Sequence, residues 1–199
     1  MTLPELTLSE LTAAERHRRI AGDFTDQVQQ VTDWDAPAPV AGWTARDVVD
    51  HLATWFPLFL SAGGVELPTG PSAATDPGAT WTHQADTVQA LLDDPDRAAG
   101  PFSHEHVGSM PVAEAIDRFY TADVFMHTWD LGRASGQDVT LESELCAQLL
   151  AGMESMEEAI RSSGQYGLKV EVPAGAGPQT RLMGFIGRDP SWQPATSPH

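Results

Sequence analysis

Asp123 and His127 are the residues whose types and spacing point most directly to chemistry. Residues four apart in a helix lie on one face, one turn from each other. The same face is expected to carry the apolar residues Ile116, Phe119, Tyr120 and Leu131. The pair is therefore expected to point toward the core. Burying an Asp beside a His is unfavourable unless the two side chains pair or bind a ligand.

His51 adds a second imidazole on a separate predicted helix. It lies at the edge of an apolar stripe that consists of Val48, Leu52, Trp55 and Phe59. Asp47, one turn upstream, is expected to hold the other ring nitrogen of His51, because carboxylates commonly orient metal-binding imidazoles in this way.

Two imidazoles and one carboxylate on facing helices would form a three-ligand site with an open position, as catalytic zinc sites have. The predicted metal ligands are thus His51, Asp123 and His127. Neutral imidazole binds zinc, nickel, copper and iron alike, so the residue types leave the metal open. We expect zinc, with nickel as the alternative. The spacing alone also fits a buried polar pair that binds nothing.

These side chains must be positioned by helices, since apolar residues recur at three- and four-residue steps. Thr44-Ala45-Arg46-Asp47 has the pattern of a capping box at a helix start. Irregular connections are expected at 65–78 and 95–108, and after Gly164 only 168–172 could form a strand. The predicted helices cover about 9–31, 44–62, 81–92, 111–134 and 141–162. This pattern predicts an all-α helical bundle with crossover connections, an additional C-terminal helix and a short irregular tail.

The composition is that of a globular protein, with 41% hydrophobic and 20% charged residues in a chain of 199. That length predicts a single domain over residues 1–199, with its core at about 9–190. One cysteine, Cys146, excludes an intramolecular disulfide framework and a cysteine-rich metal cluster.

The formal net charge is −17, from 11 basic and 28 acidic residues. An acidic surface repels phosphate groups, so nucleic acid and anionic membranes are not expected partners. The N-terminal residues lack the basic and apolar regions of a signal peptide. The most apolar stretch, 53–62, is too short to span a bilayer. A cytoplasmic protein is expected.

Two motifs resemble those of a known metal-binding family. The segment from Trp43 to Leu52, WTARDVVDHL, resembles a "GWT-x-x-D-v-x-x-HL" opening, and Asp123 to Leu131, DVFMHTWDL, resembles "D/E-x-x-x-H-x-W-D-l". The ending Gly187-Arg188-Asp189-Pro190 also resembles actinobacterial members. On these motifs the chain resembles, over about residues 10–190, the mycothiol-dependent maleylpyruvate isomerase metal-binding domain family of the DinB-like superfamily.

The resemblance implies a DinB-like four-helix bundle with a divalent metal, commonly zinc. It matches His51 to the first histidine ligand, Asp123 to the acidic ligand and His127 to the second histidine. Characterised members use the metal to activate a low-molecular-weight thiol such as mycothiol. Such activation is chemically reasonable, because a metal lowers the pKa of a bound thiol and the thiolate is the nucleophile.

Two departures limit what the resemblance transfers. The acidic position is Asp123, where the characterised isomerase has glutamate. That isomerase also carries a further C-terminal domain, whereas this chain ends soon after the fifth predicted helix. Maleylpyruvate isomerisation itself is therefore not transferred.

Three functional hypotheses remain from the sequence. The leading one is a metal-dependent enzyme that uses mycothiol or a related thiol for transfer or isomerisation of a small electrophilic substrate. The second is a non-catalytic DinB-like module that binds a metal or small molecule, as a monomer or homodimer. The third is metal-assisted hydrolysis, which ranks lowest because only Asp47 or Asp50 could serve as a general base near His51.

Other polar and aromatic residues are expected to have structural roles. We expect His17 on a solvated basic face, Asp130 and Arg133 as a helix-surface or interhelical pair, and Cys146 as a core thiol. His104-Glu105-His106 is expected in a solvated loop that could overhang the metal site. Trp43 and Trp129 are expected to pack beside the ligand helices.

Overall fold

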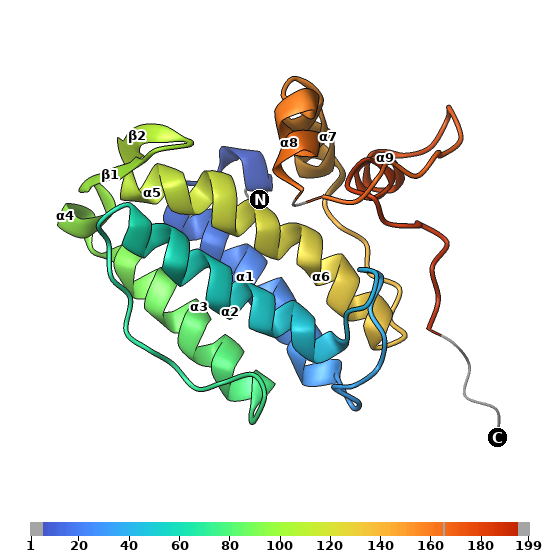
Figure 1. Cartoon of the computed structure of the whole chain (residues 1–199), viewed down its shortest axis with the longest axis horizontal. Helices are drawn as coiled ribbons and strands as arrows, with labels where there is room; N and C mark the ends of the chain where they lie inside the picture. The colour runs from blue at the N-terminus through green and yellow to red at the C-terminus, as the bar shows by residue number, and fades with distance from the viewer. Residues whose placement is uncertain (1–5, 165, 195–199) are drawn as a thin grey trace, which may run out of the picture.

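A computed structural model describes residues 6–164 and 166–194, and they are mostly helical (Figure 1). Among the long helices, α1 and α2 each contact both α3 and α6. We call these four helices the bundle: α1 (Ala13–Gln30), α2 (Ala45–Ala62), α3 (Pro77–Asp93) and α6 (Ala122–Ala134). A short 3-10 turn, η1 (Leu8–Glu10), precedes α1. The predicted all-α fold is confirmed.

The predicted capping box at the start of α2 is present. The Thr44 hydroxyl accepts the Asp47 backbone N–H at 3.3 Å, and Asp47 Oδ2 accepts the Thr44 N–H at 2.8 Å. A second capping box, between Thr12 and Glu15, starts α1 at Ala13. The first helix therefore begins later than the position near 9 that its apolar period predicted, because the cap decides the start.

The region before α5 is more ordered than the sequence predicted. Helix α3 begins at Pro77, capped by Asp76, and so starts four residues before the predicted boundary. The predicted connection at 95–108 contains α4 (Pro95–Ala98) and a two-stranded hairpin. In that hairpin β1 (Pro101–His104) pairs antiparallel with β2 (Gly108–Pro111).

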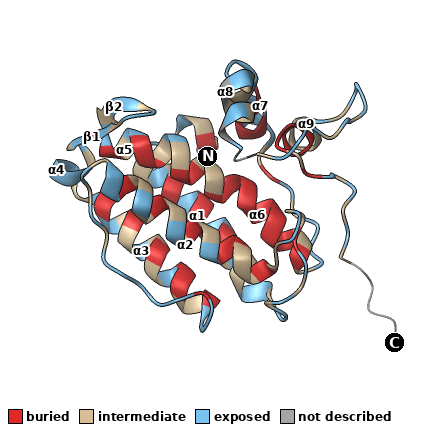
Figure 2. Cartoon of the chain, viewed as in Figure 1, coloured by how far each residue is buried: buried red, intermediate tan, exposed pale blue. Residues whose placement is uncertain are grey.

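The helix predicted from 111 to 134 has three parts. After α5 (Val112–Ala115) comes a π-helical stretch, η2 (Ile116–Thr121), and then α6. Pro111 lies just outside as the N-cap, not in the first turn. Figure 2 shows the buried residues that run along α6, where every residue of 124–132 is buried. A helix buried on all sides lies at the centre of its protein.

The C-terminal third differs most from expectation. The single helix predicted at 141–162 is two helices, α7 (Ser143–Glu154) and α8 (Glu157–Ser163), and α8 ends at Gly164 in the left-handed conformation. The segment predicted to be irregular contains α9 (Pro178–Phe185), and 168–172 is not a strand. Helix α9 packs on α7, and Figure 1 shows α7, α8 and α9 grouped beside the bundle.

No helix within 6–164 and 166–194 combines the length and the apolar character that crossing a membrane requires.

Candidate metal centre

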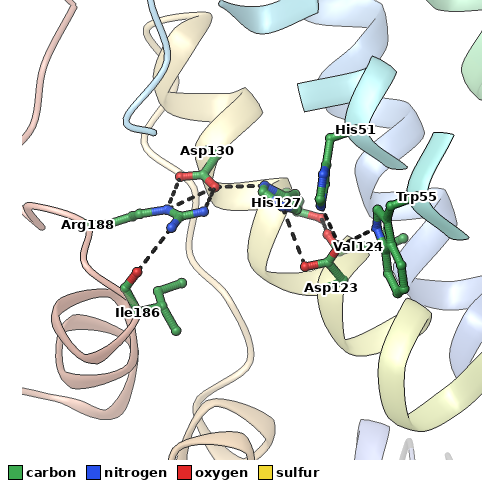
Figure 3. A network of polar contacts seen from close by, with 9 residues as sticks. His51, Trp55, Asp123, Val124, His127, Asp130, Ile186 and Arg188 are labelled. Carbon is green, nitrogen blue, oxygen red and sulfur yellow. Dashed lines mark hydrogen bonds and ion pairs between the residues drawn. The ribbon is translucent and has the colours of Figure 1, made fainter. Parts of the chain in front are cut away.

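The three predicted ligands meet between α2 and α6 (Figure 3). His51 Nε2 lies 3.1 Å from Asp123 Oδ2, and His127 Nε2 lies 3.5 Å from Asp123 Oδ1. One ligand atom from each residue falls within 4.8 Å of the others. In the described part of the chain, this is the one group of three or more His, Cys, Asp or Glu side chains placed to hold a metal ion.

Asp123 stands at the middle of this group. Its Oδ2 also accepts a hydrogen bond from Trp55 Nε1 at 2.9 Å. Burial raises the pKa of Asp123, but His127, His51 and Trp55 together outweigh that effect and hold the pKa below its usual value. The carboxylate is therefore ionised at neutral pH, as a metal ligand must be.

The three side chains differ in their exposure to solvent. The His127 side chain is 5% exposed and that of Asp123 15%, whereas that of His51 is 30% exposed. A ligand from solvent would reach the group from the His51 side.

Trp43 packs over both histidines. Its ring lies 5.0 Å from the His51 ring and stacks at 5.7 Å on the His127 ring, with an interplanar angle of 15°. The loop that carries Trp43 is fixed by a bridge between Pro37 and Thr44. The tryptophan expected to pack beside the ligand helices therefore restrains both imidazoles.

The outer nitrogen of His127 has a carboxylate partner that the sequence analysis did not identify. His127 Nδ1 lies 2.8 Å from Oδ2 of Asp130, a fully buried residue. Asp130 in turn accepts hydrogen bonds from Arg188 in the C-terminal segment, at 2.9 Å from Nη2 (Figure 3). The sequence predicts that Asp130 pairs with Arg133. Instead Arg133 forms an ion pair with Asp138 at 3.2 Å.

The Asp130 carboxylate is also held ionised. Its burial raises the pKa, but the hydrogen bond with His127 and the charge of Arg188 outweigh burial and lower it. A signal for this role was present in the sequence as the Asp of the H-x-W-D motif. The residue three positions after a helical histidine shares its face.

Asp47, the carboxylate expected to hold His51, is occupied at the start of α2. Its Oδ2 accepts the Thr44 N–H and hydroxyl at 2.8 Å and 2.7 Å. Within the described ranges, no hydrogen bond joins Asp47 to His51.

Tyr166 from the C-terminal segment lies within electrostatic range of the centre. Burial raises the pKa of Tyr166 to about 12, with the Asp123 charge adding to the rise and Arg188 opposing it. Its hydroxyl therefore stays protonated at neutral pH and can donate a hydrogen bond.

The remaining candidate residues lie away from the centre. His104 packs on Phe59 with ring centres 4.9 Å apart, and His106 lies exposed at the hairpin turn. Cys146 is buried, as expected for a core thiol. His17 is 1% exposed and lies 2.9 Å from Gln89, so the prediction of a solvated position was wrong.

Comparisons with known proteins place these residues in context. Residues 17–132 match the sequence profile of the mycothiol maleylpyruvate isomerase N-terminal domain. Uncharacterized proteins from two strains of Mycobacterium tuberculosis are each 27% identical over 165 residues, which cover 76% of this chain and 83% of theirs. The matched residues 17–132 span the three predicted ligands and Asp130, and they end before Arg188.

Crystal structures of the mycothiol-dependent maleylpyruvate isomerase are similar in fold. The TM-score is 0.53 at 17% identity for one structure, and 0.52 at 16% for a mutant with a histidine replaced by alanine. The similarity covers 75% of this chain and 72% of each of those chains. At this identity the comparison shows a shared fold.

Proposed function

Because the chain belongs to the mycothiol maleylpyruvate isomerase N-terminal domain family, we propose that it is a metal-dependent enzyme that activates a low-molecular-weight thiol. His51, Asp123 and His127 would hold the divalent metal, with zinc expected first and nickel second. Mycothiol is the first candidate thiol. The substrate would be a small electrophile that the thiol attacks.

The observation that carries this proposal is the convergence of three ligand atoms within 4.8 Å at one partly open position. The donor set fits a divalent ion of the zinc type, since it combines two imidazoles with one carboxylate. The environment fits as well, because Asp130 accepts the outer N–H of His127 and leaves Nε2 facing Asp123.

When bound, the metal would supply Lewis acidity that lowers the pKa of a thiol, so that thiolate forms near neutral pH. The chain's own residues supply position and shielding. Trp43 covers both imidazoles, and Trp55 donates to Asp123 and fixes that carboxylate.

Thiol chemistry of two kinds is compatible with this site. In an isomerisation, thiolate sulfur adds to one carbon of a double bond conjugated to a carbonyl, and the electron pair moves to the carbonyl oxygen as an enolate. The remaining single bond rotates, and the enolate then expels the thiolate as the double bond reforms. In a transfer, the sulfur displaces a leaving group and stays as a thioether. The first regenerates the thiol and the second consumes it, so assays of free thiol separate them.

Metal content tests the proposal first. Elemental mass spectrometry on untagged wild type should find about one equivalent of divalent metal. The double variant His51→Ala/His127→Ala should contain almost none. The same preparations would then be incubated with mycothiol and a panel of electrophiles that includes maleylpyruvate. We expect saturable turnover only with the metal-loaded wild type.

Two results would contradict the proposal in different ways. Absence of metal from the wild type after incubation with zinc and nickel would leave Asp123 with His51 and His127 as a buried polar cluster. Stoichiometric metal without turnover of any thiol would favour the non-catalytic binding module.

A further inference from the structure

Arg188 connects the C-terminal segment to the candidate metal centre (Figure 3). We propose that Arg188 is a positioning residue, which acts through Asp130 to hold the His127 ring with Nε2 directed at Asp123. This inference rests on the proposed metal site, and it concerns a residue 58 positions from its partner and outside the profile-matched residues.

The contact between Arg188 and Asp130 is a buried fork. Arg188 Nη2 donates to Asp130 Oδ2 at 2.9 Å, and Arg188 Nε lies 3.2 Å and 3.3 Å from the two carboxylate oxygens. The Asp130 side chain is 0% exposed and that of Arg188 10%. Removing one partner of a buried ion pair is strongly destabilising, so Arg188 is expected to hold the Asp130 carboxylate in this position.

Asp130 in turn determines which ring nitrogen of His127 donates a hydrogen bond. Its Oδ2 lies 2.8 Å from His127 Nδ1 and accepts the N–H there. An imidazole that donates through Nδ1 can bind a metal through Nε2, the nitrogen that lies 3.5 Å from Asp123 Oδ1. Arg188 therefore influences the ligand atom of His127 without touching it.

Hydrogen bonds at the end of α9 fix the position of Arg188. The Arg188 N–H bonds to the Met183 carbonyl at 2.9 Å, and the Gly187 N–H bonds to the Gly184 carbonyl at 3.2 Å. These are the two hydrogen bonds of a Schellman motif, with Gly187 in the left-handed conformation at a φ of 86°. Arg188 Nη1 also donates to the Ile186 carbonyl at 3.1 Å. These hydrogen bonds within the turn hold the guanidinium in position beside Asp130.

A purely structural ion pair between α6 and the C-terminal segment is the competing explanation. It would lower stability when broken but would leave the affinity for a metal unchanged. Zinc affinity, measured by competition with a chromophoric chelator on the full chain, separates the two explanations. Circular dichroism and thermal melting of each metal-free variant would confirm that it is folded.

Arg188→Gln should weaken zinc binding measurably, by at most the 10–100-fold usual when the direct outer partner of a metal-binding histidine is removed, because Arg188 acts on His127 only through Asp130. Arg188→Lys should recover part of that loss, because lysine restores the charge but not the fork. Arg16→Gln is the matched control. It removes another partly buried arginine, which pairs with Asp117, and should leave zinc affinity unchanged.

The double variant Arg188→Gln/Asp130→Asn tests whether Arg188 acts through Asp130. If it does, the double variant should bind zinc as Asp130→Asn alone does. Zinc affinity of Arg188→Gln within about twofold of wild type would overturn the proposal. Losses that multiply in the double variant would overturn it as well.

A metal-free readout keeps this test independent of the proposed function. Nitrogen-15 NMR of histidine-labelled protein in mildly alkaline buffer should show His127 with its proton on Nδ1 in the wild type and in Arg188→Lys. In Arg188→Gln that preference should be lost or reduced. An unchanged tautomer in Arg188→Gln would contradict the proposal. A wild type that binds no zinc but shows the Arg188-dependent tautomer would contradict the proposed function alone.

Discussion

At the scale of single residues, Asp123 is shared between three neighbours, and its loss should affect the centre more than the loss of any donor to it. Asp123→Ala should weaken zinc binding by more than about hundredfold, beyond the loss expected for an outer residue. Trp55→Phe removes one hydrogen bond of 2.9 Å to Asp123 and should weaken zinc binding about 10–100-fold, the loss typical of a direct outer partner. Chelator competition measures both. Equal losses would mean that Asp123 is not a ligand.

Cys146 is the one thiol of the chain, and its surroundings make it unsuitable as the reactive sulfur. Burial, with a smaller contribution from Glu142, raises the pKa of Cys146 from 9 to about 12. We expect no reaction with Ellman's reagent near neutral pH in the native state and full reaction in denaturant. Rapid native labelling would refute this prediction.

The same shift has a consequence for stability. Because the folded pKa lies above the unfolded one, the contribution of Cys146 is complete below about pH 9 and is lost as the pH rises toward 12. Because Cys146 is buried and its raised pKa keeps it protonated at neutral pH, we expect the thiol of the proposed reaction to come from a cofactor.

The sequence predicted that His51, Asp123 and His127 come together. Asp123 and His127 share a face through their spacing, His51 lies at the edge of an apolar stripe, and the two family motifs joined the three into one predicted site. The partner of Asp130 could not be found in this way. Arg133 was close in sequence, whereas Arg188 reaches Asp130 only after the C-terminal segment has folded back.

At the scale of secondary-structure elements, α1 carries a buried histidine, His17, although its basic neighbours in the sequence predicted an exposed position. His17 lies between Gln89 and the Tyr120 ring. Burial lowers the pKa of His17 below 6.5, and this effect outweighs the hydrogen bond to Gln89. The flanking arginines predicted a solvent-exposed position for His17. Its polar partner, Gln89, lies on α3, and no local sequence pattern predicts that contact.

His17 should therefore make stability depend on pH. Its folded pKa is depressed, so its contribution is present above about pH 6.5 and is lost as the pH falls toward the folded pKa. Each unit of depression corresponds to about 1.4 kcal/mol. Urea unfolding should show the advantage of wild type over His17→Asn shrinking between about pH 7.5 and pH 5. A constant difference would contradict this assignment.

The turn after α9 gives a second prediction at this scale. At Gly187 an added Cβ would lie 2.7 Å from the Gly167 backbone, and the residue has a positive φ. Gly187→Ala should destabilise the protein by at least about 1–2 kcal/mol, because alanine is strained at a positive φ. It should also weaken zinc binding, because the altered turn would no longer direct Arg188 toward Asp130. Gly175→Ala is the control, since nothing lies within 4 Å of an added Cβ there. Urea unfolding and chelator competition measure both effects, and equal behaviour of the two variants would refute the prediction.

Helix boundaries were predictable where a cap fixes them and less so elsewhere. The Thr44–Asp47 box was evident in sequence, whereas the π-helical stretch 116–121 has no comparable signature. That stretch ends two residues before Asp123, and π turns often occur at functional sites. Helix α9 was missed because Pro178 and the glycines around it resemble a loop, although proline suits a first helical turn.

At the scale of the whole molecule, the core consists of apolar side chains, and we expect it to form without a metal. Buried apolar side chains come from all four helices of the bundle and from α7 and α9. The candidate centre lies at the edge of this core, where one ligand is 30% exposed. Folding and metal binding should therefore be separable, unlike in small domains that are unfolded without zinc.

This separation leads to a prediction on thermal stability. Metal-free His127→Ala should remain folded but should bind little zinc, so that the substitution changes metal content more than melting temperature. Excess zinc should stabilise the wild type, by about 2.7 kcal/mol at a free concentration of 100 times Kd, because the metal binds only the folded state. The same zinc should not change the melting of His51→Ala/His127→Ala. Melting curves with and without zinc measure these effects. An unfolded metal-free His127→Ala would instead mean that the imidazole between Asp130 and Asp123 is itself required for the fold.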